Sequence, residues 1–174
     1  MTELRFTVLG EPAPAGSRTL TPVYRVVNGQ KVPVLKNGRV IMRNFDDNPK
    51  TKPWKKLVAL AAYTSVQDAR EDGRWRLGIL EDPLEVEVTF YTTRPKCHYG
   101  TGRNRQIVKT SAPAYPTTWY DSDKLERALY DALTGIVYKD DSQICRQVVA
   151  KLYAKNGEPA RAEVVVRELV RGEG

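Results

Sequence analysis

Six acidic side chains lie between residues 121 and 141, and they are the residues of this sequence best suited to chemistry. Three basic residues share the segment, and the acidic ones are Asp121, Asp123, Glu126, Asp131, Asp140 and Asp141. Carboxylate oxygens favour hard divalent cations such as Mg²⁺, with Mn²⁺ as the alternative. Such a cluster in a chain with a net charge of +7 indicates a metal-dependent site that acts on an anionic substrate.

Other kinds of catalytic site are excluded by composition. His98 is the only histidine, so a histidine-rich zinc site is ruled out and a Ser-His-Asp triad would have to include this residue. Cys97 and Cys145 form neither a CxxC metal motif nor a disulfide framework, which fits a reducing, cytoplasmic setting. No apolar run is long enough to cross a membrane, so we expect no membrane partner.

The acidic segment is predicted to form one amphipathic helix. Asp123 with Glu126 three residues later has the pattern of a capping box, and Gly135 suits the position just after a helix. On a helical wheel Arg127 and Asp131 fall opposite the predicted core face. That core face is formed by Leu125, Leu129, Ala132 and Leu133.

The remaining acidic residues flank this helix. Asp121 precedes the predicted cap in extended chain, while Asp140 and Asp141 follow a short turn and lead into a strand at Ile144. Because neighbouring strand residues point to opposite faces, only one of Asp140 and Asp141 is expected to join a shared site. A helix cap and a polar turn would explain Asp123 and Asp140 without a metal, and this alternative stays open.

Two basic segments point to nucleic acid as the anion. Residues 23–42 contain two Asn-Gly pairs, which predict two hairpin turns in a β meander. This segment is either a basic arm or a solvated ribbon whose charges prevent aggregation. Its cations, with no acid before Asp46, are Arg25, Lys31, Lys36 and Arg39, followed by Arg43.

Residues 94–118 form the second basic segment. They show no periodicity and contain no acidic residue, and a loop of this length is usually functional or disordered. Tyr99 and Tyr115 interleave with its cations, a composition that suits phosphates and exposed bases. The cations are Arg94, Lys96, Arg103, Arg105 and Lys109.

The elements that must position these residues predict a single domain over residues 1–174, of the α+β class. A strand over 5–9 is followed by a turn over 10–16, and another strand covers 84–92. A helix over 53–70, with Thr51 as a possible cap, places Trp54, Leu57, Val58, Ala61 and Val66 at core spacing. Strands over 147–153 and 162–170 read as a terminal hairpin. We expect a small mixed sheet flanked by helices.

At the acidic segment the sequence resembles the RusA-like crossover junction endodeoxyribonucleases, or Holliday junction resolvases. The family pattern is approximately D-x-D-N-x-x-K-x-x-x-D-A-L, a short turn, and then D-D-x-Q-[IV]. The chain matches it with Asp121-x-Asp123, then Asp131-Ala132-Leu133, then Asp140-Asp141-Ser142-Gln143-Ile144. The family's opening strand and G-x-P motif correspond to residues 6–12.

The resemblance implies a RusA-like homodimer that uses Mg²⁺ to place paired nicks in four-way DNA junctions. Asp121, Asp123 and Asp141 would be the metal ligands. Arg127 stands where the family has a catalytic Lys, and its guanidinium can stabilise charge but cannot be deprotonated to carry a proton.

Two further positions depart from the family pattern. Lys124 replaces the family's Asn, and Ala15 stands where the family has a basic residue. The expected partner is branched DNA. The residues expected to bind it are Arg18, the nearest substitute for that missing basic residue, with Lys124, Arg94, Lys96, Arg103, Arg105 and Lys109. Two alternatives remain: a non-cleaving DNA-structure-binding protein, and a broader branched-DNA or flap nuclease.

Overall fold

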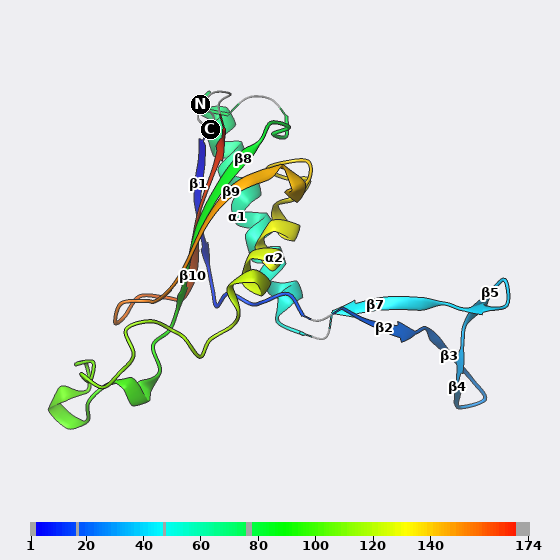
Figure 1. Cartoon of the computed structure of the whole chain (residues 1–174), viewed down its shortest axis with the longest axis horizontal. Coiled ribbons are helices and arrows are strands. Elements are labelled where there is room, and N and C mark those ends of the chain that lie inside the picture. Colours follow the sequence, from blue (N-terminus) through cyan, green and yellow to red (C-terminus); the bar gives the residue numbers. More distant parts are fainter. Residues whose placement is uncertain (1–2, 17, 47, 76–77, 170–174) are drawn as a thin grey trace.

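The centre of the fold is a four-stranded mixed sheet. The computed structural model describes residues 3–16, 18–46, 48–75 and 78–169 (Figure 1). The strand order is β1-β10-β8-β9, with β8 and β9 parallel and the other neighbours antiparallel. The strands are β1 (Glu3–Leu9), β8 (Leu84–Thr92), β9 (Ile144–Tyr153) and β10 (Arg161–Glu168). Helices α1 (Thr51–Glu71) and α2 (Ser122–Leu133) cover one face, so the α+β prediction is confirmed.

One face of this sheet is apolar because three strands alternate strictly. In β8 every second side chain from Leu84 to Thr92 is buried, as the sequence predicted. The same alternation in β1 buries Leu4, Phe6 and Val8. In β10 it buries Ala162, Val164 and Val166. These residues form the floor of the core.

The two helices close the core over this floor. On α2 the predicted face is confirmed, since Leu125, Leu129 and Leu133 have no exposed surface. On α1 the buried residues follow an i, i+4 stripe from Trp54 through Val58, Ala62 and Val66, whereas the predicted core residue Leu57 is 43% exposed. Within the described ranges, no helix is both long and apolar enough to cross a membrane.

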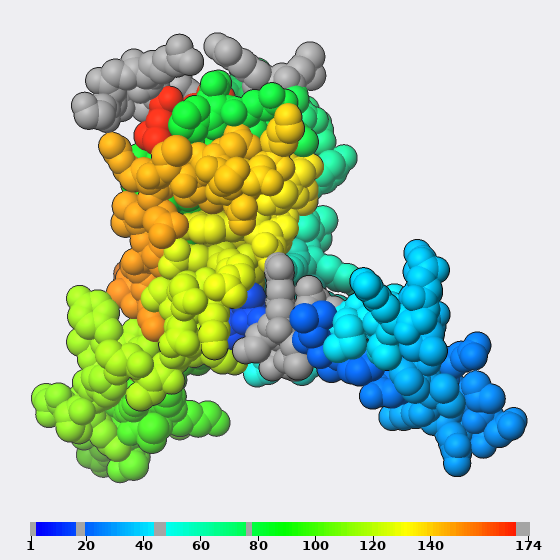
Figure 2. Space-filling model, turned by 45° about the vertical axis from the view of Figure 1, so that its right-hand side comes forward, coloured from blue at the N-terminus to red at the C-terminus, as the bar shows by residue number. Residues whose placement is uncertain are grey.

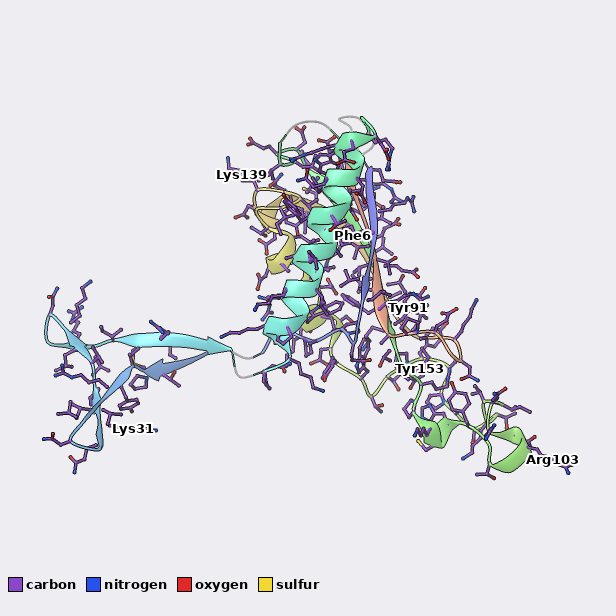
Figure 3. The ribbon with its side chains drawn as sticks, turned by 180° about the vertical axis from the view of Figure 1, so that it is seen from behind. Phe6, Lys31, Tyr91, Arg103, Lys139 and Tyr153 are labelled. Atoms are coloured by element: carbon purple, nitrogen blue, oxygen red, sulfur yellow. The ribbon has the colours of Figure 1, made fainter. Side chains whose placement is uncertain are left out.

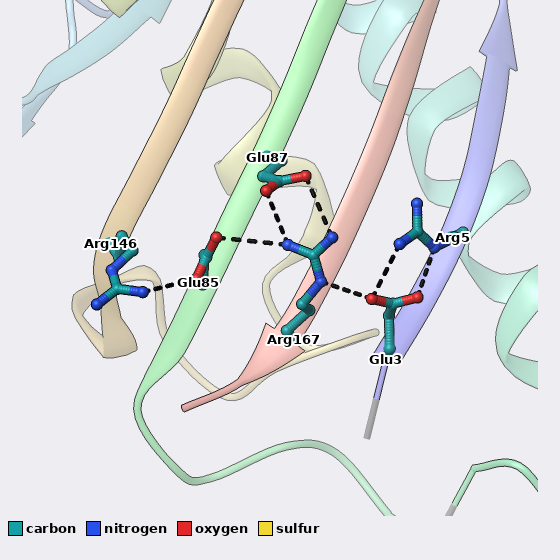
Figure 4. Close-up of polar contacts among 6 residues, drawn as sticks. All are labelled: Glu3, Arg5, Glu85, Glu87, Arg146 and Arg167. Atoms are coloured by element: carbon teal, nitrogen blue, oxygen red, sulfur yellow. Dashed lines mark hydrogen bonds and ion pairs between the residues drawn. The ribbon is translucent and has the colours of Figure 1, made fainter. Parts of the chain in front are cut away.

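The other face of the sheet is open and carries a network of ion pairs (Figure 4). Arg167 at its centre contacts Glu3, Glu85 and Glu87, the last at 2.8 Å. Arg5 pairs with Glu3, and Arg146 pairs with Glu85 at 3.3 Å. Hydrogen bonds from Arg5 and Arg167 lower the pKa of Glu3. Three cations and three carboxylates cancel in this network, so it offers no net charge to an anion.

The predicted terminal hairpin is wrong. The two last strands form as expected, but β8 lies between β9 and β10. The turn after α2 delivers the chain to the edge where β8 begins, with Leu84 opposite Ile144, so β9 runs parallel to β8. The connection through Asn156 and Gly157 therefore crosses over β8 before it reaches β10.

Residues 18–46, here called the arm, stand clear of the sheet and helices (Figure 1). They form three separate two-stranded ribbons, β2-β7, β3-β4 and β5-β6. Positive φ angles at Asn28 and Asn37 confirm the two predicted hairpin turns. The strands are β2 (Arg18–Pro22), β3 (Tyr24–Val27), β4 (Gln30–Pro33), β5 (Leu35–Lys36), β6 (Arg39–Val40) and β7 (Met42–Asp46).

The predicted meander is wrong, because these ribbons meet at a three-way junction of backbone hydrogen bonds. The amide of Val34 donates to the carbonyl of Val23 at 2.7 Å, and the amide of Ile41 donates to the carbonyl of Val34 at 2.8 Å. The amide of Val23 donates to the carbonyl of Ile41, also at 2.8 Å. These bonds close the junction and direct the two hairpins away from each other.

Residues 93–118, here called the basic loop, are folded rather than extended. The loop contains two short 3₁₀ turns, Lys96–His98 and Gly102–Asn104. An antiparallel bridge pairs Tyr99, just after the first turn, with Val108, which follows the second. The Arg94 guanidinium lies 4.0 Å from the ring centre of Tyr153 at the end of β9. His98 packs edge-on against the same ring, at 5.6 Å between centroids. The only histidine therefore has a packing role in this loop.

Candidate functional site

The acidic residues at the start of α2 are exposed. The helix begins at Ser122, and Asp121 precedes it in extended conformation with a ψ of 140°. The predicted capping box at Asp123 and Glu126 is wrong, because the amide of Leu125 already donates to the carbonyl of Asp121 and the helix starts earlier. The side chains of Asp121 and Asp123 are 72% and 67% exposed. Both carboxylates are thus available to a ligand.

A cation stands beside each of these two carboxylates. Lys124 Nζ lies 3.7 Å from Asp121 Oδ2, and Arg127 Nη2 lies 3.7 Å from Asp123 Oδ2. Both pairs are largely exposed, so the attraction within each is weak. Neither cation is therefore held firmly by its carboxylate partner.

A pocket adjoins this end of α2, and hydrogen bonds hold the segments around it in place. Thr51 Oγ1 at the start of α1 donates to the carbonyl of Pro14 at 2.7 Å, and the amide of Ala15 donates to the carbonyl of Lys124 at 2.8 Å. Lys151 Nζ on β9 donates to the carbonyl of Tyr120 at 2.8 Å. The pocket is lined by Pro14, Ala15, Gly16, Asn48, Trp119, Tyr120, Asp121 and Lys124.

The basic residue expected after β1 has two candidate positions, Ala15 in the turn and Arg18 in the following strand. Ala15, at the position where a basic residue is expected, is buried against α2. Arg18 begins β2 at the base of the arm, but its side chain lies outside the described part of the structure.

Asp140 and Asp141 have different roles at the other end of α2. Asp140 accepts from the amide of Ser142 at 2.9 Å and its own amide donates to Gln143 Oε1, which forms a capping box for a short 3₁₀ turn, Asp141–Gln143. The hydrogen bonds from Ser142 lower the pKa of Asp140. Asp140 therefore caps the polar turn, as one of the two sequence-based explanations expected. The side chain of Asp141 is exposed and has no hydrogen bond or ion pair among the described residues.

Asp131, which also matches the family pattern, joins the two helices. Its Oδ2 lies 2.6 Å from Lys55 Nζ on α1, and both side chains are about three-quarters buried. The helical wheel placed Asp131 on the polar face, but no local pattern indicates that a residue 76 positions earlier would contact it. Asp131 is therefore part of the α1–α2 contact.

The predicted metal ligands do not converge within one chain. Asp121 and Asp123 lie at the first turn of α2, while Asp141 lies beyond the last one, and twelve helical residues span about 18 Å. Asp141 lies instead near Tyr138, whose pKa is raised by burial first, then by Tyr130, and then by the carboxylates of Asp141 and Asp131. In the ranges that the structure describes, no three His, Cys, Asp or Glu side chains gather closely enough to hold a metal ion.

Glu126 was predicted to be a cap partner, but its side chain is instead partly buried on α2. Burial raises its pKa, and the neighbouring carboxylate of Asp123 raises it further. The sequence did not indicate this partial burial, since a glutamate three residues after an aspartate at a helix start has the pattern of a cap partner. It is a third carboxylate on the same side of α2 as Asp123.

The DNA-binding candidates of the basic loop fall into two groups. Arg94 donates to the carbonyl of Pro113 at 2.9 Å, and Lys109 donates to the carbonyl of Cys97 at 2.9 Å, so both also hold the loop together. Arg103 lies at the loop's far tip (Figure 3). A cavity against the β9–β10 connection brings together Arg94, Lys96, Arg105 and a cation that the sequence did not single out, Lys155.

We expect the Lys55–Asp131 pair to stabilise the fold measurably. In a double-mutant cycle with Lys55→Ala and Asp131→Ala, followed by urea denaturation, the coupling should be about 0.5–1 kcal/mol, because burial shields the pair from solvent. The Arg74–Asp72 pair has the same 2.6 Å separation but is more than half exposed, and its coupling should be too small to measure. Equal couplings for the two pairs would show that burial adds nothing.

Comparison with known proteins identifies the family of this chain. The profile of the family described as Endodeoxyribonuclease RusA matches residues 30–167. A protein of Bacillus subtilis (strain 168), described as Uncharacterized protein YqaN, is 30% identical over 166 residues, which cover 95% of this chain and 96% of that protein. The chain therefore belongs to the RusA endodeoxyribonuclease family.

Proposed function

We propose that this chain is a Mg²⁺-dependent, structure-selective endonuclease that resolves four-way DNA junctions by paired nicks. The observation that carries the proposal is the position of Asp121 and Asp123. These exposed carboxylates lie at the start of α2, where Asp121 lines a pocket together with the turn that precedes the arm. The arm and the basic loop project from this end of the body to either side (Figure 2). DNA phosphates held by the two projections would therefore be presented to the carboxylates.

Each candidate residue has a role in this proposal. Asp121 and Asp123 bind the metal, for which Mg²⁺ is the natural choice and Mn²⁺ a substitute. Arg127 stabilises charge that develops on the scissile phosphate. Lys124 and Arg18 contact the DNA backbone near the cut. The basic loop holds a DNA arm through Arg94, Lys96, Arg103, Arg105 and Lys109.

Asp141 enters the proposal through a second copy of the chain. Within one chain it lies at the opposite end of α2 from Asp121 and Asp123, so one ion cannot contact all three. We propose a homodimer in which Asp141 of the partner subunit completes the site. Two such composite sites, related by a two-fold axis, would suit the near-symmetry of a four-way junction.

The central experiment compares nicking of a synthetic four-way junction with that of a linear duplex, with and without Mg²⁺. We expect Asp141→Asn to abolish nicking while junction binding is kept, since a ligand charge is lost. Asp140→Asn is the matched control, and it should cut normally because asparagine caps a turn as well as aspartate does. Normal cutting by Asp141→Asn would remove this residue from the site.

The same assay separates the alternatives. Junction binding by the wild-type chain without metal-dependent nicking would favour a non-cleaving DNA-structure-binding protein. Equal cutting of flaps, three-way branches and four-way junctions would favour a broader branched-DNA nuclease.

Subunit mixing tests the composite site. Asp123→Asn and Asp141→Asn chains, each inactive alone, should recover nicking when they are refolded together, because one of the two sites in the mixed dimer then contains only wild-type ligands. Each mixed dimer should nick only one strand of the junction that it binds, since its other site carries both substitutions. A mixture as inactive as its parents, with mixed dimers shown by native mass spectrometry, would mean that both residues serve the same subunit.

Arg127→Ala should lower the nicking rate by more than about tenfold, the loss expected when a donor to developing charge is removed. Arg127→Lys should recover part of the rate, because it restores a cation at the same position. Arg74→Ala, an exposed cation just after α1, serves as the control. Single-turnover rates at saturating protein measure the effect, and an undiminished rate for Arg127→Ala would exclude it from the chemistry.

A further inference from the structure

The positive charge of this protein resides on its two projections. The arm carries six Lys and Arg residues against one acidic residue, and the basic loop carries five against none. The rest of the chain has 17 basic and 20 acidic residues, so it is net negative. Figures 1 and 3 show that the arm and the basic loop both stand off the body. A polyanion would therefore be attracted to the projections and not to the sheet or the helices.

Two cations face each other at the tip of the shorter hairpin of the arm. Lys36 on β5 and Arg39 on β6 are directly opposite across the Asn37-Gly38 turn. Like charges in this position destabilise a ribbon. Residues 19–45 contain no acidic residue, and no ion pair compensates either cation within the described structure. The hairpin therefore retains a repulsion that an anion between the two side chains would relieve.

The surface at this tip has a suitable shape. A concavity is lined by Lys36, Asn37, Arg39, Val40 and Ile41. A guanidinium can bind two oxygens of one phosphate while an ammonium contacts a third. Further along the arm, Lys31 and Arg25 face Val26 and Val32 across β3 and β4. Both hairpins of the arm thus carry cations.

A nucleic-acid occupant fits the arm better than a second copy of the chain. On β5 and β6 the opposed pair Leu35 and Val40 lies on one face and the opposed cations Lys36 and Arg39 lie on the other, and a second copy of the chain would bring the same uncompensated cations with it. A two-stranded ribbon is marginally stable by itself and gains from any ligand that bridges its strands. Uncompensated cations at the tip select a polyanion as that ligand.

We infer that the arm is a second DNA-backbone-binding element, with Lys36 and Arg39 as its main phosphate contacts. The inference rests on the proposed function, which supplies DNA as the polyanion. The arm and the basic loop leave the same end of the body towards opposite sides (Figure 2). DNA that touches both and also reaches Asp121 must change direction between them. The arm therefore contributes more to binding a branched DNA than to binding a straight duplex.

The test is a salt titration of DNA binding by fluorescence anisotropy, in EDTA so that no cutting occurs. The variant is Lys36→Gln with Arg39→Gln, and the probes are a four-way junction and a linear duplex. Each phosphate contact contributes about −0.9 to the slope of log K against log salt, so the junction slope should flatten by about one to two units. The duplex slope should change less. Arg103→Ala with Arg105→Ala, in the basic loop, should flatten both slopes.

Two controls make the result specific. Arg5→Gln with Arg74→Gln removes the same charge from the body, at two exposed cations that already have acidic partners, so the slopes should not change. Lys36→Arg with Arg39→Lys keeps both cations and should retain the wild-type slope. The thermal midpoint of the Gln variant should not fall, because a like-charge repulsion is removed.

Failure of this inference can be told apart from failure of the proposed function. Unchanged affinity and slope in the Lys36 and Arg39 variant, with a normal loss in the basic-loop variant, would overturn the role of the arm and leave the nuclease proposal standing. A change of oligomeric state in sedimentation, without a change of slope, would also overturn it by making the arm a subunit contact. An arm-dependent slope in a protein that never nicks DNA would support the inference and count against the nuclease.

Discussion

The rest of the structure depends on one constraint, which is that the sheet has a single apolar face to be covered. Strict alternation along β1, β8 and β10 puts Leu4, Val88 and Val164 on the same side, and α1 and α2 must pack there. Covering that side uses the whole apolar stripe of α2. Its opposite stripe, with Asp123 and Arg127, is thereby left in solvent. The availability of the candidate site is thus a consequence of core packing.

The turn after β1 carries this constraint from the core to the site. Through Pro14 and Ala15 it binds both Thr51 at the start of α1 and Lys124 in the first turn of α2. The arm leaves the body directly after this turn. A single short segment thus fixes where the two helices begin relative to each other.

The surfaces of the body carry balanced charges, whereas the two projections carry an excess of cations. On the open sheet face Arg167 and its partners balance one another, and Lys55 and Asp131 balance between the helices. The arm and the basic loop, which pack on little else, keep cations without acidic partners in the sequence around them. Ion pairs at partly shielded positions contribute to the fold, whereas unpaired cations on projections raise the local concentration of an anion.

The sequence by itself determined the local elements, because their physical causes are local. Alternation identified β8, helical spacing identified the core face of α2, and the Asn-Gly pairs identified two hairpin turns. The family pattern at residues 121–144 correctly indicated the family.

Only the tertiary structure decided what depends on distant contacts. The position of β8 between β9 and β10, the pairing of Asp131 with Lys55 and the divergence of the arm hairpins all arise between segments that no local pattern relates. The separation of Asp121 from Asp141 is a further example. The two residues belong to neighbouring parts of one sequence pattern, but α2 lies between them and places them at its opposite ends.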